Sequence, residues 1–190
     1  SYSISCSIYS APERLRDLAE DDWLEFYVVL VRENADGRVP ALTPRLFALK
    51  EGDRLNVGEK IVGHFTAEAV RPADNVVFLS TGTGEAPHNA MIAELLGHGH
   101  QGRIINSVCV RERADFAYLD LHRELERQYS NYKYLTLTTR ERENLDPTHP
   151  NNVGKEYLQK LVESGRLEAE LGHPLDPRKT HVYLCGNPAM

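Results

Sequence analysis

The sequence predicts a fold of class α/β plus β, in which a partial antiparallel β-barrel precedes a doubly wound parallel sheet. Two observations support this prediction. The segment before Arg71-Pro72 combines β-rich stretches with turn signals. After this dipeptide, apolar strand candidates alternate with amphipathic helical segments, which is the pattern of βαβ units. We therefore assign residues 1–71 to a barrel domain and residues 72–190 to a parallel-sheet domain.

The barrel domain contains one clear strand candidate, residues 24–32 (LEFYVVLVR), which is followed by a turn signal at Asp36-Gly37. Thr43 and Pro44 resemble an N-cap and a first helical residue, and they predict a short helix over residues 46–50. Weaker strand signals occur at residues 1–7 and 54–57. This much β structure is too short to close a barrel alone.

The second domain has four predicted strands, at residues 76–80, 104–110, 134–138 and 181–185. Each predicted helix between them has an apolar face, marked by Met91, Ile92, Leu95 and Leu96 in the first, by Leu119, Leu121, Leu125 and Tyr129 in the second, and by Tyr157, Leu158, Leu161 and Val162 in the third. Ligands of such sheets bind at the carboxyl ends of the strands.

Composition narrows the class of protein. Of the 190 residues, 41% are hydrophobic and 26% are charged, which is ordinary for a globular chain. No stretch approaches the roughly 18 apolar residues of a membrane span, and the first residues lack the features of a signal peptide, so we expect a cytoplasmic protein with no membrane partner. A net charge of −6 argues against a nucleic-acid partner.

The potential metal ligands are sparse. Cys6, Cys109 and Cys185 lie far apart and form no CxxC pair, which argues against a disulfide framework, a zinc ribbon or an iron–sulfur cluster. His98 and His100 have no Cys, Asp or Glu nearby in ligand spacing. The sequence therefore predicts no metal site.

Glycine or arginine follows every predicted parallel strand. The four continuations are Thr81-Gly82-Thr83-Gly84, Arg111-Glu112-Arg113, Thr139-Arg140-Glu141-Arg142 and Gly186-Asn187-Pro188. Each alone fits a plain turn or a solvated strand end, but together they favour an anionic, phosphate-bearing ligand. The strongest signal is STGTGEAP at residues 80–87, whose glycines permit close backbone approach and whose following helix offers free N–H groups.

The motif TGTGxAP is followed about a hundred residues later by CGNPxM, which starts at Cys185. This pair resembles the nicotinamide-domain signature of the ferredoxin–NADP reductase superfamily. Three segments, VRERADFAYLDLHRELERQY, ESGRLEAELG and CGNPAM, look closest to the bacterial flavodoxin/ferredoxin–NADP reductases. The resemblance covers essentially the whole chain. It implies that the family's first barrel strands and its segment after Met190 are missing here.

The resemblance also implies an FAD site in the barrel domain. Ser1-Tyr2-Ser3 matches the last three positions of the family's Arg-x-Tyr-Ser motif, so Tyr2 would stack on the isoalloxazine and Ser3 would hydrogen-bond near flavin N5. The other implied FAD-binding residues are Tyr27, Val28, Val29, Ala41, Leu42, Thr43 and Thr83. One departure is Pro40, where the family usually has Gly.

The NADP-binding residues implied are Thr81, Gly82, Thr83, Gly84, Val110, Arg111, Thr139, Arg140, Lys155, Gly186, Asn187, Pro188 and Met190. Arg111 and Arg140 predict preference for NADPH over NADH, because a 2′-phosphate favours cationic partners. Cys185 would lie beside the nicotinamide and complete the catalytic set with Tyr2 and Ser3.

The function implied is an FAD-dependent oxidoreductase, a ferredoxin–NADP(+) reductase, that transfers electrons between NADPH and ferredoxin or flavodoxin. A flavin suits this exchange because it accepts a hydride and passes electrons on singly. Two alternatives remain open at this point. One is an oxygenase reductase component or a free-flavin reductase of the same superfamily. The other is a nucleotide-binding regulatory module without turnover.

Overall fold

A four-stranded parallel sheet organises the larger part of the computed structural model, which describes residues 3–12, 14–17, 23–33, 36–58 and 63–187. Its strands are β5 (Asn75–Thr81), β6 (Ile104–Val110), β7 (Tyr132–Thr138) and β8 (Thr180–Cys185), in the order β7-β6-β5-β8. The chain moves outward from β5 to β7 and then returns to the other side of β5. The strand order therefore switches between β5 and β8, which is where ligands of such sheets bind.

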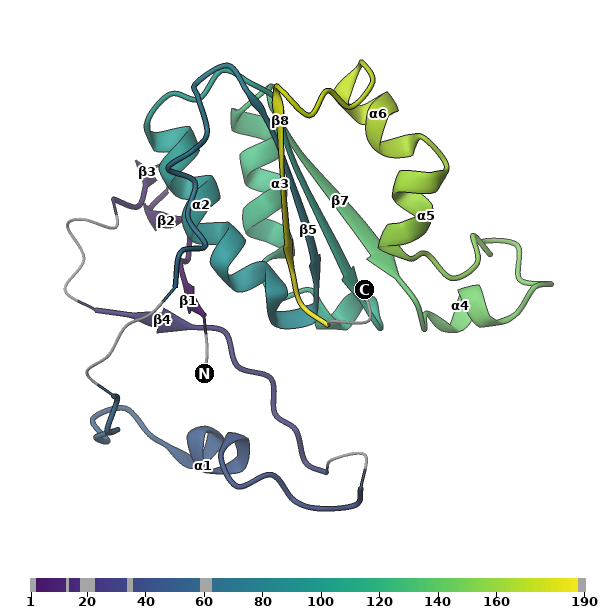
Figure 1. Ribbon diagram of the computed structural model, residues 1–190. Helices are drawn as coiled ribbons and strands as arrows, with labels where there is room; N and C mark the ends of the chain where they lie inside the picture. The colour runs from purple at the N-terminus through teal and green to yellow at the C-terminus, as the bar shows by residue number, and fades with distance from the viewer. Residues whose placement is uncertain (1–2, 13, 18–22, 34–35, 59–62, 188–190) are drawn as a thin grey trace.

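Helices cover both faces of this sheet (Figure 1). One face packs against α2 (Glu85–Gly97) and α3 (Leu119–Gln128), and the other packs against α5 (Leu158–Glu163) and α6 (Arg166–Leu171). Alternate residues of β5 supply the two cores: Val76 and Phe78 belong to the first, Val77 and Leu79 to the second. Each fully buried side chain of this size contributes about 1.5–3 kcal/mol of hydrophobic stabilisation.

The four predicted parallel strands and the three predicted helices are all confirmed. Strand β6 has the predicted bounds, whereas β7 begins at Tyr132 rather than Tyr134. The sequence did not predict α6, nor the short helix α4 (Arg142–Leu145). Gly165 (φ 71°) and Gly172 (φ 83°) bound α6, and their left-handed conformations separate it from α5 and end it cleanly.

The N-terminal part contains two short antiparallel pairs, β1 (Ile4–Ser5) with β4 (Glu25–Phe26) and β2 (Tyr9–Ala11) with β3 (Arg14–Leu15). The predicted strand over residues 24–32 is wrong in extent, because only Glu25–Phe26 pairs. Residues 27–32 have no ladder partner within the described ranges, and an unpaired strand leaves its backbone groups unsatisfied. For the same reason the weak signal at residues 54–57 forms no strand.

The short helix α1 (Thr43–Ala48) follows, with Pro44 in its first turn. It begins three residues before the predicted span 46–50 and ends two residues before the end of that span. The prediction that Thr43 caps this helix is wrong, since Leu42 is the N-cap residue and no side chain caps it. The Thr43 hydroxyl instead donates to the carbonyl of Val31 (3.1 Å) and accepts from its N–H (3.3 Å). It therefore attaches α1 to the segment after β4.

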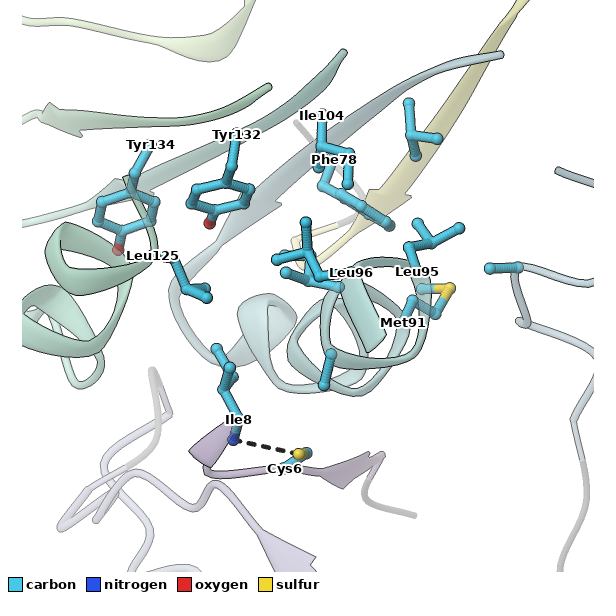
Figure 2. Packing of buried hydrophobic residues seen from close by; sticks show 14 of the residues in the cluster. Cys6, Ile8, Phe78, Met91, Leu95, Leu96, Ile104, Leu125, Tyr132 and Tyr134 are labelled. Atoms are coloured by element: carbon cyan, nitrogen blue, oxygen red, sulfur yellow. Dashed lines mark hydrogen bonds between the residues drawn. The ribbon is translucent and has the colours of Figure 1, made fainter. Parts of the chain in front are cut away.

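The N-terminal part shares a core with the parallel-sheet part. Cys6 and Ile8 are fully buried below α2, where they join the cluster that contains Phe78 and Leu96 (Figure 2). The Ile8 N–H donates to the Cys6 Sγ over 3.1 Å, and Ile8 has φ 65°, which is unfavourable for a β-branched residue. The burial of its side chain offsets that strain, which is of order 1–3 kcal/mol. The domain boundary after residue 71 stays a prediction.

None of the helices in the described ranges is long and apolar enough to cross a membrane.

Candidate functional site

A large open pocket, about 1350 Å³ in volume, lies at the carboxyl edge of the parallel sheet. One wall comes from the carboxyl ends of the four strands and the residues just after them, including Thr81, Arg111, Arg140 and Gly186. The opposite wall comes from the N-terminal part, through Ser3, Tyr27 and residues 29–33. The pocket is therefore bounded by both parts of the chain and covers the switch in strand order between β5 and β8.

The loops that follow β5 and β8 interlock through two glycines. A Cβ atom on Gly84 would lie 2.0 Å from the carbonyl oxygen of Cys185, and one on Gly186 (φ 142°) would lie 2.2 Å from Thr81 Oγ1. The same Thr81 hydroxyl accepts a 2.7 Å hydrogen bond from the Asn187 N–H. The two motifs of the sequence therefore form one structure, because only glycine allows the two backbones to meet this closely.

Gly82 serves a different purpose. Its φ of 52° is left-handed, and a Cβ atom there would meet no protein atom within 4 Å, so the space beside it belongs to the pocket. The short 3-10 turn η1 (Gly82–Gly84) leads directly into α2, whose first-turn residue Ala86 also lines the pocket. This combination of an open glycine loop and a helix N-terminus fits the diphosphate of a dinucleotide.

Arg111 and Arg140 lie together on the pocket wall, and the Arg140 N–H donates to the Arg111 carbonyl over 2.7 Å. Neither guanidinium forms an ion pair with a described residue, so neither Glu112 nor Glu141 pairs with them. Glu141 instead accepts from the backbone N–H of Arg113.

The Arg113 guanidinium is already engaged, since it lies 2.8 Å from Glu143. The Glu112 side chain and backbone exchange hydrogen bonds with Asp115, as in a capping box. The nearby acids are thus committed to other partners, and Arg111 and Arg140 remain available to an anionic ligand.

Lys155, the third predicted cation, is exposed and does not line the pocket. The adjacent wall is formed by Tyr157, Leu158 and Gln159, none of which the sequence predicted as a site residue. A role for Lys155 toward a 2′-phosphate stays a prediction.

Ser3, Tyr27 and Val29 line the N-terminal wall, whereas Val28 does not. Ala41, Leu42 and Thr43 lie around the start of α1, outside the lining of this pocket. Four predicted site residues, namely Ser1, Tyr2, Pro188 and Met190, lie outside the described residues. The structure thus brings together most of the dinucleotide residues but only part of the predicted flavin residues.

Comparison with known proteins decides the family. The family model described as "Oxidoreductase NAD-binding domain" matches residues 78–190, which is more than half of the chain. The chain belongs to this oxidoreductase family. The resemblance predicted from the two motifs is confirmed by curated relatives named flavodoxin/ferredoxin–NADP reductase, from Shigella flexneri and Escherichia coli (strain K12). Each is 36% identical over 171 residues, covering 88% of this chain and 62% of the relative.

A ferredoxin–NADP reductase from Pseudomonas aeruginosa is 30% identical over 179 residues, covering 90% of this chain and 64% of the relative. The chain thus spans about three fifths of the length of these relatives. A ferredoxin NADP+ reductase from Neisseria gonorrhoeae, solved with bound FAD and NADP, has the same fold: the TM-score is 0.71 at 20% identity, covering 99% of this chain and 66% of that one. The predicted class, a partial barrel with a doubly wound sheet, is confirmed.

Within this oxidoreductase fold, the two pocket thiols are poorly suited to nucleophilic chemistry. Burial raises the pKa of Cys185, and burial aided by Glu156 raises that of Cys109 to about 11. Both thiols therefore stay protonated at neutral pH, and they shape the pocket as small apolar groups. Cys109, on strand β6, belongs to one of the two hydrophobic cores and also reaches the pocket wall.

A buried polar network behind the glycine loop was missed by the sequence analysis. Glu85, which fills the variable position of TGTGxAP, is 1% exposed, and its Oε1 lies 2.9 Å from both Tyr134 Oη and His122 Nε2. His122 Nε2 lies this close to the Glu85 carboxylate without forming a hydrogen bond to it. Tyr132 Oη lies 2.7 Å from His122 Nδ1 on the opposite side of the ring. The sequence did contain a signal for this network, because Glu85 is a charged residue placed between the glycine loop and an apolar helix face.

No group of three or more His, Cys, Asp or Glu side chains in the described part of the chain is arranged to hold a metal ion. His100, one of the two histidines considered above, places its Nε2 2.9 Å from the carbonyl oxygen of Asp74.

Proposed function

We propose that this chain is part of an FAD-dependent oxidoreductase, a ferredoxin–NADP(+) reductase, that transfers electrons between NADPH and a ferredoxin or flavodoxin. The observation that carries the proposal is one continuous pocket with two chemically distinct walls. The glycine loop and the Arg111–Arg140 pair suit a phosphorylated dinucleotide, while Ser3 and Tyr27 face them from the N-terminal part. Hydride transfer requires two ring systems to be held against each other, and such a pocket can hold both.

The chain's own residues would bind and orient the cofactors. Thr81–Gly84 and the start of α2 would hold the NADP diphosphate, and the two arginines would hold the 2′-phosphate. A flavin, when bound, accepts a hydride and releases electrons singly. Tyr2, Ser3 and Cys185 would surround the reacting rings, with the neutral Cys185 thiol helping to exclude water. Val28, Ala41, Leu42, Thr43 and Thr83 are proposed to complete the FAD site.

The relatives support this assignment by their names, and the Neisseria protein of the same fold contains FAD and NADP. Purification of the full-length protein tests it. We expect a yellow protein that releases FAD on denaturation and oxidises NADPH when ferricyanide or ferredoxin is present. Bound FMN would favour another branch of the superfamily. A colourless protein that binds NADPH without oxidising it would favour a regulatory module.

The choice of ferredoxin or flavodoxin predicts a salt-sensitive reaction. These carriers are usually acidic, and this chain itself has a net charge of −6, so docking would depend on a local basic surface. Arg16, one candidate for that surface, lies 3.7 Å from Glu25 and stacks over Trp23, whereas Arg14 is exposed. We expect ferredoxin reduction to slow as ionic strength rises. A rate of ferredoxin reduction that does not depend on ionic strength would exclude electrostatic steering.

A further inference from the structure

Tyr118 lies at the junction of the two walls of the pocket, although it does not line the pocket itself. It is the N-cap residue of α3 and ends the loop that begins at Arg111. Ala114, Asp115 and Ala117, which precede it in this loop, do line the pocket. Tyr118 therefore lies directly behind the wall that carries the proposed phosphate-binding arginines.

The hydroxyl of Tyr118 contacts both strands of the first antiparallel pair. It lies 3.1 Å from Ser5 Oγ on β1 and 3.2 Å from Glu25 Oε1 on β4. Ser5 and Glu25 are opposite each other in the β1–β4 register, so the hydroxyl contacts both members of one cross-strand pair. Ser7 also donates to the Glu25 carboxylate, and Arg16 lies 3.7 Å from it.

The ring of Tyr118 holds the neighbouring pocket residue. Tyr27 packs edge-on against it, with ring centroids 5.5 Å apart and an interplanar angle of 87°. The Tyr27 hydroxyl donates to the carbonyl of Asp115 over 3.4 Å. Tyr27 is thus held at two points, and both belong to the loop that starts at Arg111.

The hydroxyl of Tyr118 stays protonated, so its contact with Glu25 does not depend on pH near neutrality. Burial, with a smaller contribution from Glu25, raises its pKa to about 12, so the hydroxyl keeps its proton and can donate to the Glu25 carboxylate. A hydrogen bond to a charged acceptor is stronger than one between neutral groups. The contact between loop and ladder therefore persists across the physiological pH range.

We propose that Tyr118 is a positioning residue that fixes Tyr27 in the flavin-side wall and couples this wall to the Arg111 loop. The inference rests on the proposed function, since it concerns the same pocket. Tyr118 acts through Tyr27 and touches neither cofactor. Because one residue braces both walls, a change in it should affect the fit of the flavin as well as the stability of the chain.

The test uses the full-length protein and three variants: Tyr118→Phe, Tyr118→Leu and, as a control, Tyr129→Phe at the other end of α3. FAD affinity is measured by titration of the apoprotein, and the visible circular dichroism of bound FAD reports the flavin's surroundings. Tyr118→Leu loses the ring contact and the hydroxyl contacts, so FAD should bind about tenfold more weakly and its dichroism should change. Tyr118→Phe keeps the ring, and we expect about threefold weaker binding. The control should match wild type.

Several results would overturn the inference. If Tyr118→Leu lowers only the melting temperature and leaves FAD affinity and dichroism unchanged, the residue is merely structural. If Tyr118→Leu does not fold, Tyr118→Phe and Glu25→Gln decide instead, and wild-type FAD affinity in both would reject the coupling. A wild-type protein that binds no flavin would reject the proposed function itself, and this inference with it.

Discussion

At the scale of single residues, the site depends on which charges already have partners. Arg113 is paired with Glu143 at 2.8 Å, while Arg111 and Arg140 face the pocket without an acidic partner in the described ranges. An exposed ion pair contributes about 0–1 kcal/mol, whereas a charge-assisted contact with a bound phosphate contributes about 1.5–3 kcal/mol. Substitution of Arg111 or Arg140 should therefore weaken phosphate binding much more than substitution of Arg113.

Replacement of Arg140 by Ala should raise the KM for NADPH by about ten- to a hundredfold, because the 2′-phosphate loses a cationic partner. The KM for NADH should hardly change, since NADH has no such phosphate. Steady-state kinetics with both cofactors measures this difference. Arg113→Ala, on the neighbouring loop, is the matched control and should leave both values near wild type. An equal loss for both cofactors in Arg140→Ala would mean that the residue is structural.

His88 allows a prediction about pH. Its ring packs between Phe65 and Phe78, and neither ring nitrogen has a hydrogen-bond partner among the described residues. Burial, with a smaller contribution from His122, lowers its pKa from 6.5 to about 3. Between these values the unfolded chain binds a proton that the folded protein excludes. Stability therefore falls as the pH decreases below 6.5, by about 1.4 kcal/mol per pH unit.

His88→Phe should remove this pH dependence, because phenylalanine fills the same apolar site without taking up a proton. The difference in unfolding free energy between variant and wild type should grow by about 2 kcal/mol from pH 7 to pH 5. Urea unfolding at the two pH values measures it. His98→Gln, at the exposed end of the same helix, should follow the wild type. Parallel pH profiles for His88→Phe and wild type would contradict the prediction.

At the scale of elements, the site depends on the interlock between the loops after β5 and β8. Gly84→Ala would force a Cβ atom against the Cys185 carbonyl, which lies only 2.0 Å from its ideal position. We expect lower thermal stability together with at least tenfold weaker NADP binding, since both loops must shift. Gly97→Ala, at the far end of the helix that Gly84 precedes, is the matched control, because its Cβ would meet no atom within 4 Å. Calorimetric titration with NADP+ and thermal unfolding test both variants, and unchanged NADP binding in Gly84→Ala would contradict the interlock.

The elements also differ in how well the sequence predicted them. Buried parallel strands such as Ile104–Val110 are largely apolar over their whole length, so their extent was predictable. Residues 24–32 have equal β propensity, but a strand also requires a neighbour, and a local pattern contains no information about distant partners. The helix Arg166–Leu171 was missed because two left-handed glycines confine it to a length too short for a periodic signal.

At the scale of the whole molecule, the pocket exists because two parts of the chain share one core. Ile8 and Cys6 anchor the first ladder under α2, and this anchoring brings Ser3 and Tyr27 to face the glycine loop. The sequence predicted the dinucleotide wall well, since motifs with fixed spacing encode it locally. It did not predict Tyr118 or Glu85, whose importance comes from contacts between segments far apart in the chain.

If the two walls of the pocket hold a nicotinamide and a flavin together, NADPH should reduce the bound flavin directly. Anaerobic titration of the full-length, FAD-loaded protein with NADPH tests it most directly, with the visible flavin absorbance as the readout. We predict bleaching of the flavin band at close to one NADPH per flavin, because one hydride reduces one isoalloxazine. A bound flavin that keeps its full absorbance in excess NADPH would contradict the claim.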